Sequence, residues 1–132
     1  NDNTLELYTK EVVENYINHF NSYELDLAAN YILKLAINTN LYLNEKQPWL
    51  LIKDIENKSV VSNIIYNVLE STRIIGLLLL PLLPDLSTNI DLQLGSLYNK
   101  NESWNDQLNW GKLNYNSLLP APTPIIEKLE YE

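Results

Sequence analysis

The stretch from Leu25 to Lys53 limits what this chain can fold into more than any other, because it joins a long helical pattern to a proline–tryptophan pair. Apolar residues recur at helical spacing through its first part, and polar residues mark the opposite face. The apolar positions are Leu25, Ala28, Ala29, Ile32, Leu35, Ala36 and Leu43. After a polar break over 44–47, Pro48 can occupy the first turn of a second helix, where no backbone N–H is needed. Trp49 would then be held at a rigid helix start, and the pattern leaves open whether its indole is buried or presented to a ligand.

Three more segments carry helical periodicity, and strand signals are weak throughout the chain. The expected helices, including the two in the stretch above, span 5–20, 23–44, 50–55, 60–80 and 86–94. Residues with suitable N-cap side chains precede three of them, at Ser22, Ser59 and Asp85, and Gly95 is expected to end the last. The sequence therefore predicts an all-α fold.

The chain changes character after Gly95. Residues 96–116 are polar and studded with aromatic side chains, and the prolines within 120–124 favour an extended segment. We expect a helical domain over 1–95 and an extended tail over 96–132. Because this tail is rich in Trp and Leu, it is expected to pack back on the helix bundle.

The composition excludes several classes of site. The chain has 132 residues, enough for one domain with its own core, and it contains no Cys and one His. Disulfides, thiolate metal sites and cysteine nucleophiles are excluded, and His19 near a predicted helix end is expected to be a surface or half-buried residue. The absence of Met, even at position 1, is expected of an internal or processed piece of a longer protein. The apolar run over 74–83 is about half as long as a bilayer requires, so no membrane span is predicted.

The net charge of −8 argues against non-specific nucleic-acid binding, which depends on neutralising phosphates. The charge is uneven, because residues 1–26 carry six acids against one base, whereas residues 34–58 carry four lysines against three acids. The sequence around Trp49 is therefore less negatively charged than the chain as a whole and repels an anion less, without forming a basic patch. Arg73 is expected to pair with Glu70 or to lie on the surface, rather than to bind a ligand. By composition and spacing alone, the chain is a soluble helical domain with no visible enzyme site.

Five motifs nevertheless occur in a fixed order. The first contains Asn40-x-Tyr42-Leu43, then Pro48-Trp49, then Lys53. The second has Arg73 eight residues before Pro81, within R-I-I-G-L-L-L-L-P-L-L-P, and the third is Leu94-Gly95. The fourth consists of Trp104, Leu108, Trp110-Gly111 and Leu113, and the fifth runs from Pro122 to Glu130. Together, over residues 25–132, they resemble the anticodon-binding domains of methionyl-tRNA synthetases.

This resemblance implies the anticodon-binding helix bundle of class I aminoacyl-tRNA synthetases, here reading a CAU anticodon. It implies that Trp49 stacks on an unstacked anticodon base and that Pro48 shapes the same surface. Such stacking contributes about 1–3 kcal/mol per base. The parent protein would be a cytoplasmic ligase that attaches methionine to its tRNA, with ATP and Mg²⁺ bound in a catalytic domain outside this chain. The implied partners are the tRNA and that catalytic domain, and neither a catalytic residue, a cofactor nor a metal site is expected in the chain itself.

The chain departs from the family pattern in several places. The family has an Asn and an Arg, four residues apart, on a helix that precedes the region where this chain begins, and no such pair exists here. The chain is therefore expected to lack the first helix of the bundle and half of the anticodon site. Asp91 stands where the family has an aromatic residue, and Ile126, Glu127 and Lys128 stand where it has Phe-Pro-Arg. Two alternatives stay open: the anticodon domain of a leucine, isoleucine or valine synthetase, and a helical protein-interaction module with no tRNA role.

Overall fold

The computed structural model describes residues 2–113, and these residues form helices and no strand, as the sequence predicts. The elements are α1 (Thr4–Asn21), α2 (Leu25–Lys46), α3 (Pro48–Leu51), the 3-10 turn η1 (Ile55–Asn57), α4 (Lys58–Leu79), α5 (Pro84–Leu94) and α6 (Trp104–Gln107). The proline-containing stretch 120–124, predicted to be extended, lies outside the described residues. No helix in the described part of the chain has both the length and the apolar character needed to cross a membrane.

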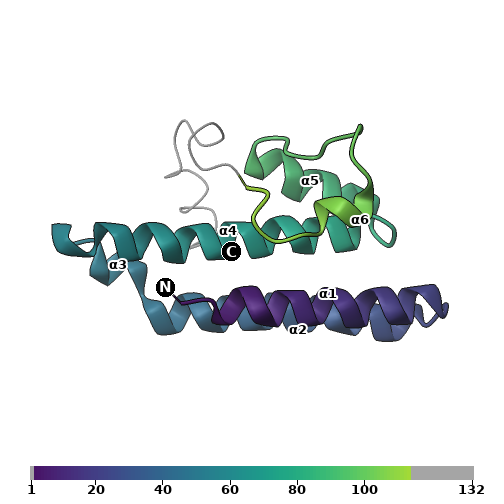
Figure 1. Cartoon of the computed structure of the whole chain (residues 1–132), viewed down its shortest axis with the longest axis horizontal. Coiled ribbons are helices and arrows are strands. Elements are labelled where there is room, and N and C mark those ends of the chain that lie inside the picture. Colours follow the sequence, from purple (N-terminus) through teal and green to yellow (C-terminus); the bar gives the residue numbers. More distant parts are fainter. Residues whose placement is uncertain (1, 114–132) are drawn as a thin grey trace.

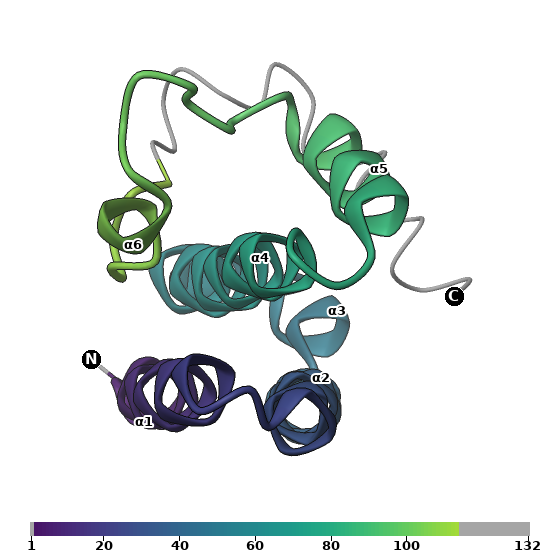
Figure 2. The same ribbon diagram turned by 90° about the vertical axis from the view of Figure 1, so that its right-hand side faces the viewer.

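Three long helices form the body of the molecule. α1 and α2 pack side by side in opposite directions, and α4 packs on both of them (Figure 1). Seen end on, these three helices form a triangle, and α5 and α6 lie on the other side of α4 (Figure 2). The short helix α3 lies at the end of the bundle where α2 finishes and α4 begins (Figure 1). The Pro48-Trp49 pair therefore lies at one end of the molecule.

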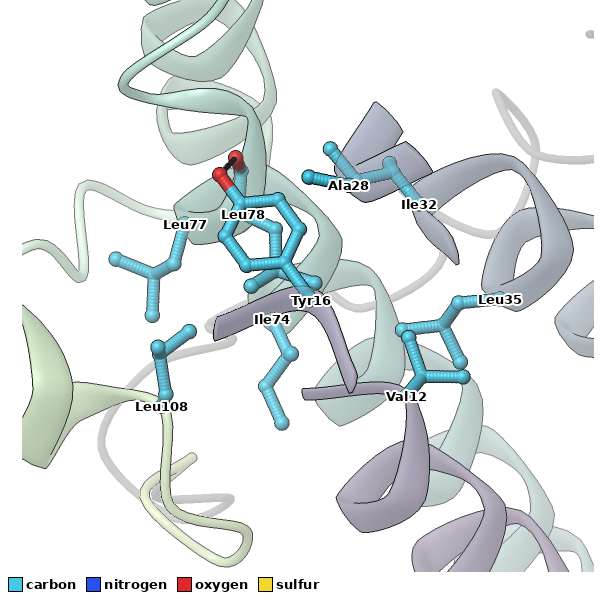
Figure 3. Packing of buried hydrophobic residues seen from close by; sticks show 9 residues of the cluster. All are labelled: Val12, Tyr16, Ala28, Ile32, Leu35, Ile74, Leu77, Leu78 and Leu108. Carbon is cyan, nitrogen blue, oxygen red and sulfur yellow. Dashed lines mark hydrogen bonds between the residues drawn. The ribbon is translucent and has the colours of Figure 1, made fainter. Parts of the chain in front are cut away.

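The main core lies where α1, α2 and α4 meet, and a residue that follows α6 completes it (Figure 3). Its buried members are Val12, Tyr16, Ala28, Ile32, Leu35, Ile74, Leu77, Leu78 and Leu108. Tyr16 is fully buried, and its hydroxyl donates to the backbone carbonyl of Leu78 at 2.7 Å. Burial raises the pKa of Tyr16 to about 12. The hydrogen bond allows this polar group to lie in an apolar core without an unmet donor.

None of the three residues predicted as N-caps, Ser22, Ser59 and Asp85, takes that position. The N-caps of α2, α4 and α5 are Glu24, Asn57 and Leu83, and none of these accepts a capping hydrogen bond through its side chain. In α5 the reason is Pro84, whose fixed φ suits the first helical turn, so the helix begins before Asp85. Ser22 is instead the C-cap of α1.

The segment that follows α5 is attached to α4 through a buried ion pair. Arg73 is 7% exposed, and its Nε and Nη2 donate to the two carboxylate oxygens of Glu70 at 2.6 and 2.9 Å. Arg73 also donates to the backbone carbonyls of Gln107 at 2.6 Å and Asn109 at 2.9 Å. Glu70 in turn accepts from the backbone N–H groups at 111–112. The predicted ion pair is confirmed, and the surface position is wrong because the α6 segment covers the guanidinium.

Apolar residues of the same segment pack on the helices as well. Leu108 and Leu113 are buried, and the indole N–H of Trp104 donates to the backbone carbonyl of Leu77 at 2.7 Å. The residues from 104 to 113 thus supply buried members of two hydrophobic clusters, and Trp110 packs against the third. The division of the chain into two domains at residue 95 stays a prediction.

Candidate nucleic-acid interface

The two residues predicted to bind an anticodon, Pro48 and Trp49, form the start of α3. One residue, Gln47, separates α3 from α2, and its backbone is left-handed with φ 48° and ψ 59°. The N–H of Gln47 donates to the carbonyl of Leu43 at 3.0 Å, and its carbonyl accepts from the N–H of Leu50 at 3.0 Å. The chain therefore passes from one helix to the next without an intervening loop.

The two predicted site residues differ sharply in exposure. Pro48 is buried at the first turn of α3, as expected of a residue that fixes its own φ and needs no hydrogen-bond acceptor. Trp49 keeps 40% of its surface exposed. The indole is therefore not a core residue, and it is available to a ligand from solvent. Contact of either residue with RNA stays a prediction.

The far end of α3 is anchored in the bundle. Leu51 packs against a buried cluster that consists of Leu5, Tyr42, Ile64 and Val68. Its carbonyl accepts from Nδ2 of Asn57 at 3.1 Å. The side chain of Asp54 caps η1 by accepting from the N–H of Glu56 at 3.0 Å. Because both ends of the α3 turn are held, Trp49 is presented on a fixed backbone.

The residues around Trp49 expose more apolar surface than the sequence suggested. Leu50, Ile52 and Ile55 are 49, 63 and 85% exposed. The predicted helix over 50–55 would have packed some of these side chains on the bundle, but α3 ends at Leu51. The sequence does carry a signal for this outcome. Polar residues at 53–54 and 56–59 leave any helix here too short to bury the three apolar side chains.

An ion pair joins the start of the described chain to the end of α2 beside this surface. Nζ of Lys46 lies 2.9 Å from Oδ2 of Asp2. Hydrogen bonds from the side chain and backbone of Thr4, with that from Lys46, lower the pKa of Asp2 to about 2. The hydrogen bond to Asp2 raises the pKa of Lys46. Since Asp2 neutralises one of the lysines within 34–58, the surplus of one positive charge inferred for that stretch falls to zero.

The arrangement offers a stacking surface and shows no catalytic constellation. An exposed indole on a rigid turn can stack on a base that is splayed out of an RNA loop. Lys53 and Lys58 are exposed and form no ion pair among the described residues, so they can meet phosphates. His19, in the last turn of α1, has its Nδ1 3.0 Å from Oε1 of Glu24, and its ring stacks on Tyr31. Within residues 2–113, no group of three or more His, Asp or Glu side chains is placed to hold a metal ion.

Other motif residues have structural roles. Tyr42 is buried, and its hydroxyl accepts from Nδ2 of Asn67 at 2.9 Å. Asp91, which replaces an aromatic residue of the family pattern, accepts from the N–H groups of Leu97 at 2.8 Å and Tyr98 at 3.0 Å. The carboxylate therefore fixes the turn after α5. This departure has a local structural function and does not disturb the surface around Trp49.

Comparisons with known proteins agree with the motif series. A family model described as the anticodon binding domain of methionyl tRNA ligase matches residues 1–131. A methionine–tRNA ligase of Synechocystis is 33% identical, over 98% of this chain and 26% of its own length. The ligase of Listeria monocytogenes is 30% identical over 99% of this chain and 20% of its own length. That of Sulfolobus acidocaldarius is 41% identical over 55% of this chain and 12% of its own length.

These matches show how much of this chain and of each relative is similar. The chain spans at most 26% of the length of these three relatives. The family match also begins well before residue 25, where the motif series starts, and it includes α1. The resemblance inferred from the motifs is therefore confirmed. This chain belongs to the family of anticodon-binding domains of methionyl-tRNA ligases.

Proposed function

We propose that this domain recognises the anticodon loop of a methionine-accepting tRNA, with Trp49 as the platform on which one splayed anticodon base stacks. The observation that carries the proposal is the indole itself, 40% exposed at the start of α3 in a domain of this family. Pro48, buried directly before it, restricts the backbone and so limits the positions that the indole can take. Stacking of one base on an aromatic side chain contributes about 1–3 kcal/mol.

The proposed parent protein is a cytoplasmic methionine–tRNA ligase, which attaches methionine to its tRNA using ATP. ATP and Mg²⁺ belong, in this proposal, to the catalytic domain of the same polypeptide, and the residues described above supply binding rather than chemistry. The partners of the domain are then the tRNA and that catalytic domain. The names of the three relatives support this assignment.

The position of Asp2 places the start of α1 at the end of the molecule that carries the proposed stacking residue. Asp2 lies against Lys46, at the end of α2 that leads into α3. Figure 1 shows the start of α1 on the same side of the molecule as α3. The Asn and Arg that the family resemblance implies for anticodon readout are proposed to act at this end of the molecule.

The first experiment replaces Trp49 with alanine in the complete polypeptide that contains this chain. We expect Trp49→Ala to weaken tRNA binding by about 5- to 150-fold, which corresponds to the loss of one stacked base. We also expect a smaller preference for a CAU anticodon over an altered one. Thermal stability should change little, because truncating a fully buried Trp costs about 3–5 kcal/mol and this indole is 40% exposed.

Tyr98→Ala is the matched control, because Tyr98 is also 40% exposed but lies in the loop after α5, away from α3. It should leave tRNA affinity and anticodon preference unchanged. Wild-type affinity in Trp49→Ala would show that the stacking role is wrong. A parent polypeptide that binds tRNA without preference for any anticodon would contradict the proposed function as a whole.

A further inference from the structure

The residue before Pro48 has few backbone conformations open to it. A proline disfavours the right-handed helical region for the residue that precedes it, so α2 cannot simply continue through Gln47 into α3. Gln47 must leave the helix either extended or left-handed. It is left-handed here, with φ 48° and ψ 59°, which is uncommon for a residue other than Gly, Asn or Asp.

The left-handed conformation determines where α3 begins. It lets the N–H of Gln47 close the last turn of α2 on Leu43, while its carbonyl accepts from Leu50 at 3.0 Å and Leu51 at 3.3 Å. An extended Gln47 would break this continuity and direct the chain away from the end of α2. The exposed side chain of Gln47 makes no capping hydrogen bond to α3, so the backbone alone performs this role.

We propose that the left-handed backbone of Gln47 is the positioning element that sets the Trp49 indole for base stacking. The proposal rests on the proposed function, in which Trp49 is the stacking residue. Gln47 acts through the direction of α3, whose far end is held in the bundle by Leu51 and by Asn57.

The test exchanges the backbone preference at position 47 without changing the interface. Gln47→Val places a β-branched residue where φ is positive, which favours the extended alternative. Gln47→Gly adopts the left-handed conformation freely. We expect Gln47→Val to weaken binding of the parent polypeptide to tRNA by about 5- to 30-fold, within the limit set by Trp49→Ala. Gln47→Gly should keep wild-type affinity.

A second measurement follows Trp49 without RNA. In the NMR spectrum of the complete polypeptide, the indole N–H resonance that Trp49→Ala removes is that of Trp49. Gln47→Val should shift this resonance and leave that of Trp104, which packs on the main core, in place. Gln47→Gly should leave both unchanged.

Tyr23 provides the matched control. It is 90% exposed and has φ 61°, at the turn before α2 and at the other end of that helix. Tyr23→Val introduces the same backbone conflict there, so it should lower the melting temperature without changing tRNA affinity or the Trp49 resonance. If Gln47→Val behaves like Tyr23→Val in both measurements, or if Gln47→Gly weakens binding as much as Gln47→Val, the positioning role is wrong. If Trp49→Ala itself binds tRNA normally, the proposed function fails instead, and a shifted Trp49 resonance in Gln47→Val still reports the coupling.

Discussion

Asp2 joins the first turn of α1 to the last turn of α2 through one carboxylate. Its Oδ1 accepts from the N–H and the hydroxyl of Thr4 at 2.9 and 2.6 Å, and its Oδ2 lies 2.9 Å from Nζ of Lys46. These contacts lower its pKa from 3.8 to about 2. Between these pH values the unfolded chain binds more protons than the folded chain at this residue. The stability contributed by Asp2 is therefore complete above about pH 4 and is lost as the pH falls towards 2.

Asp2→Asn should remove this acid-dependent contribution. We expect the variant to be less stable than the wild type at neutral pH by less than about 1 kcal/mol, because the ion pair is accessible to solvent. The two proteins should converge as the pH falls towards 2. Urea unfolding at a series of pH values measures this convergence, with Glu14→Gln, an exposed substitution elsewhere on α1, as the control. A difference that persists undiminished in acid would contradict the assignment.

At the scale of single residues, some features of the candidate site follow from the neighbouring sequence alone and others do not. Pro48 at the first turn of α3 is predictable, because its φ is fixed by its own ring. The difference between the exposed Trp49 and the partly buried Trp104 is not predictable, since Trp104 packs on the main core and donates to the carbonyl of Leu77 in another helix. The left-handed Gln47 is only half predictable. Its proline neighbour excludes the right-handed region, but the choice between the two remaining conformations depends on how Leu51 packs.

At the scale of elements, the Glu70–Arg73 pair connects α4 to the segment that includes α6. Arg73→Met leaves the Glu70 carboxylate buried without its cation and removes hydrogen bonds to two backbone carbonyls. Breaking a buried pair in this way costs about 3–5 kcal/mol. We expect amide hydrogen exchange at 107–112 to accelerate more than exchange in α1 and α2, because the bonds between α4 and this segment are lost first.

An exposed ion pair on α1 is the control for this prediction. Nζ of Lys10 lies 2.9 Å from Glu6, and Lys10→Met should cost at most about 0.5 kcal/mol. Exchange at 107–112 should not respond to it. Equal stability of Arg73→Met and Lys10→Met, or a uniform rise of exchange across the whole chain in Arg73→Met, would show that the buried pair does not hold the segment.

The helices themselves were largely predictable from the sequence, and their ends less so. Periodicity places α1, α2, α4 and α5 within two residues of their observed bounds, because each buries a regular apolar face. The starts depend on more than a suitable side chain. α5 begins at Pro84 rather than after Asp85, because proline suits the first turn. The four-residue helix α6 is too short to produce a periodic pattern and is held by Arg73 instead.

At the scale of the whole molecule, charge determines from which side RNA approaches, and stacking determines which anticodon is preferred. A net charge of −8 repels RNA at long range, and six of the acids lie within residues 1–26, three of them on α1. Figure 2 places α1 at one edge of the bundle and α3 beside α2 and α4. RNA is therefore expected to approach the α3 end, where Lys53 and Lys58 are exposed. Specificity then depends on short-range contacts at Trp49, because phosphate contacts carry no direct sequence information.

This division of roles predicts distinct salt dependences. Replacing both Lys53 and Lys58 with glutamine should reduce the slope of log affinity against log salt by about 1.4, since each phosphate contact to single-stranded RNA contributes about 0.7. Preference for the CAU anticodon should persist in that variant. Trp49→Ala should do the reverse, lowering anticodon preference while leaving the slope unchanged. Replacing Lys10 and Lys100, which are exposed on α1 and in the loop after α5, should change neither quantity. Salt titrations of tRNA binding by the complete polypeptide, run with a CAU anticodon and with an altered one, measure both quantities. An unchanged slope after loss of Lys53 and Lys58 would mean that RNA does not approach by the α3 end.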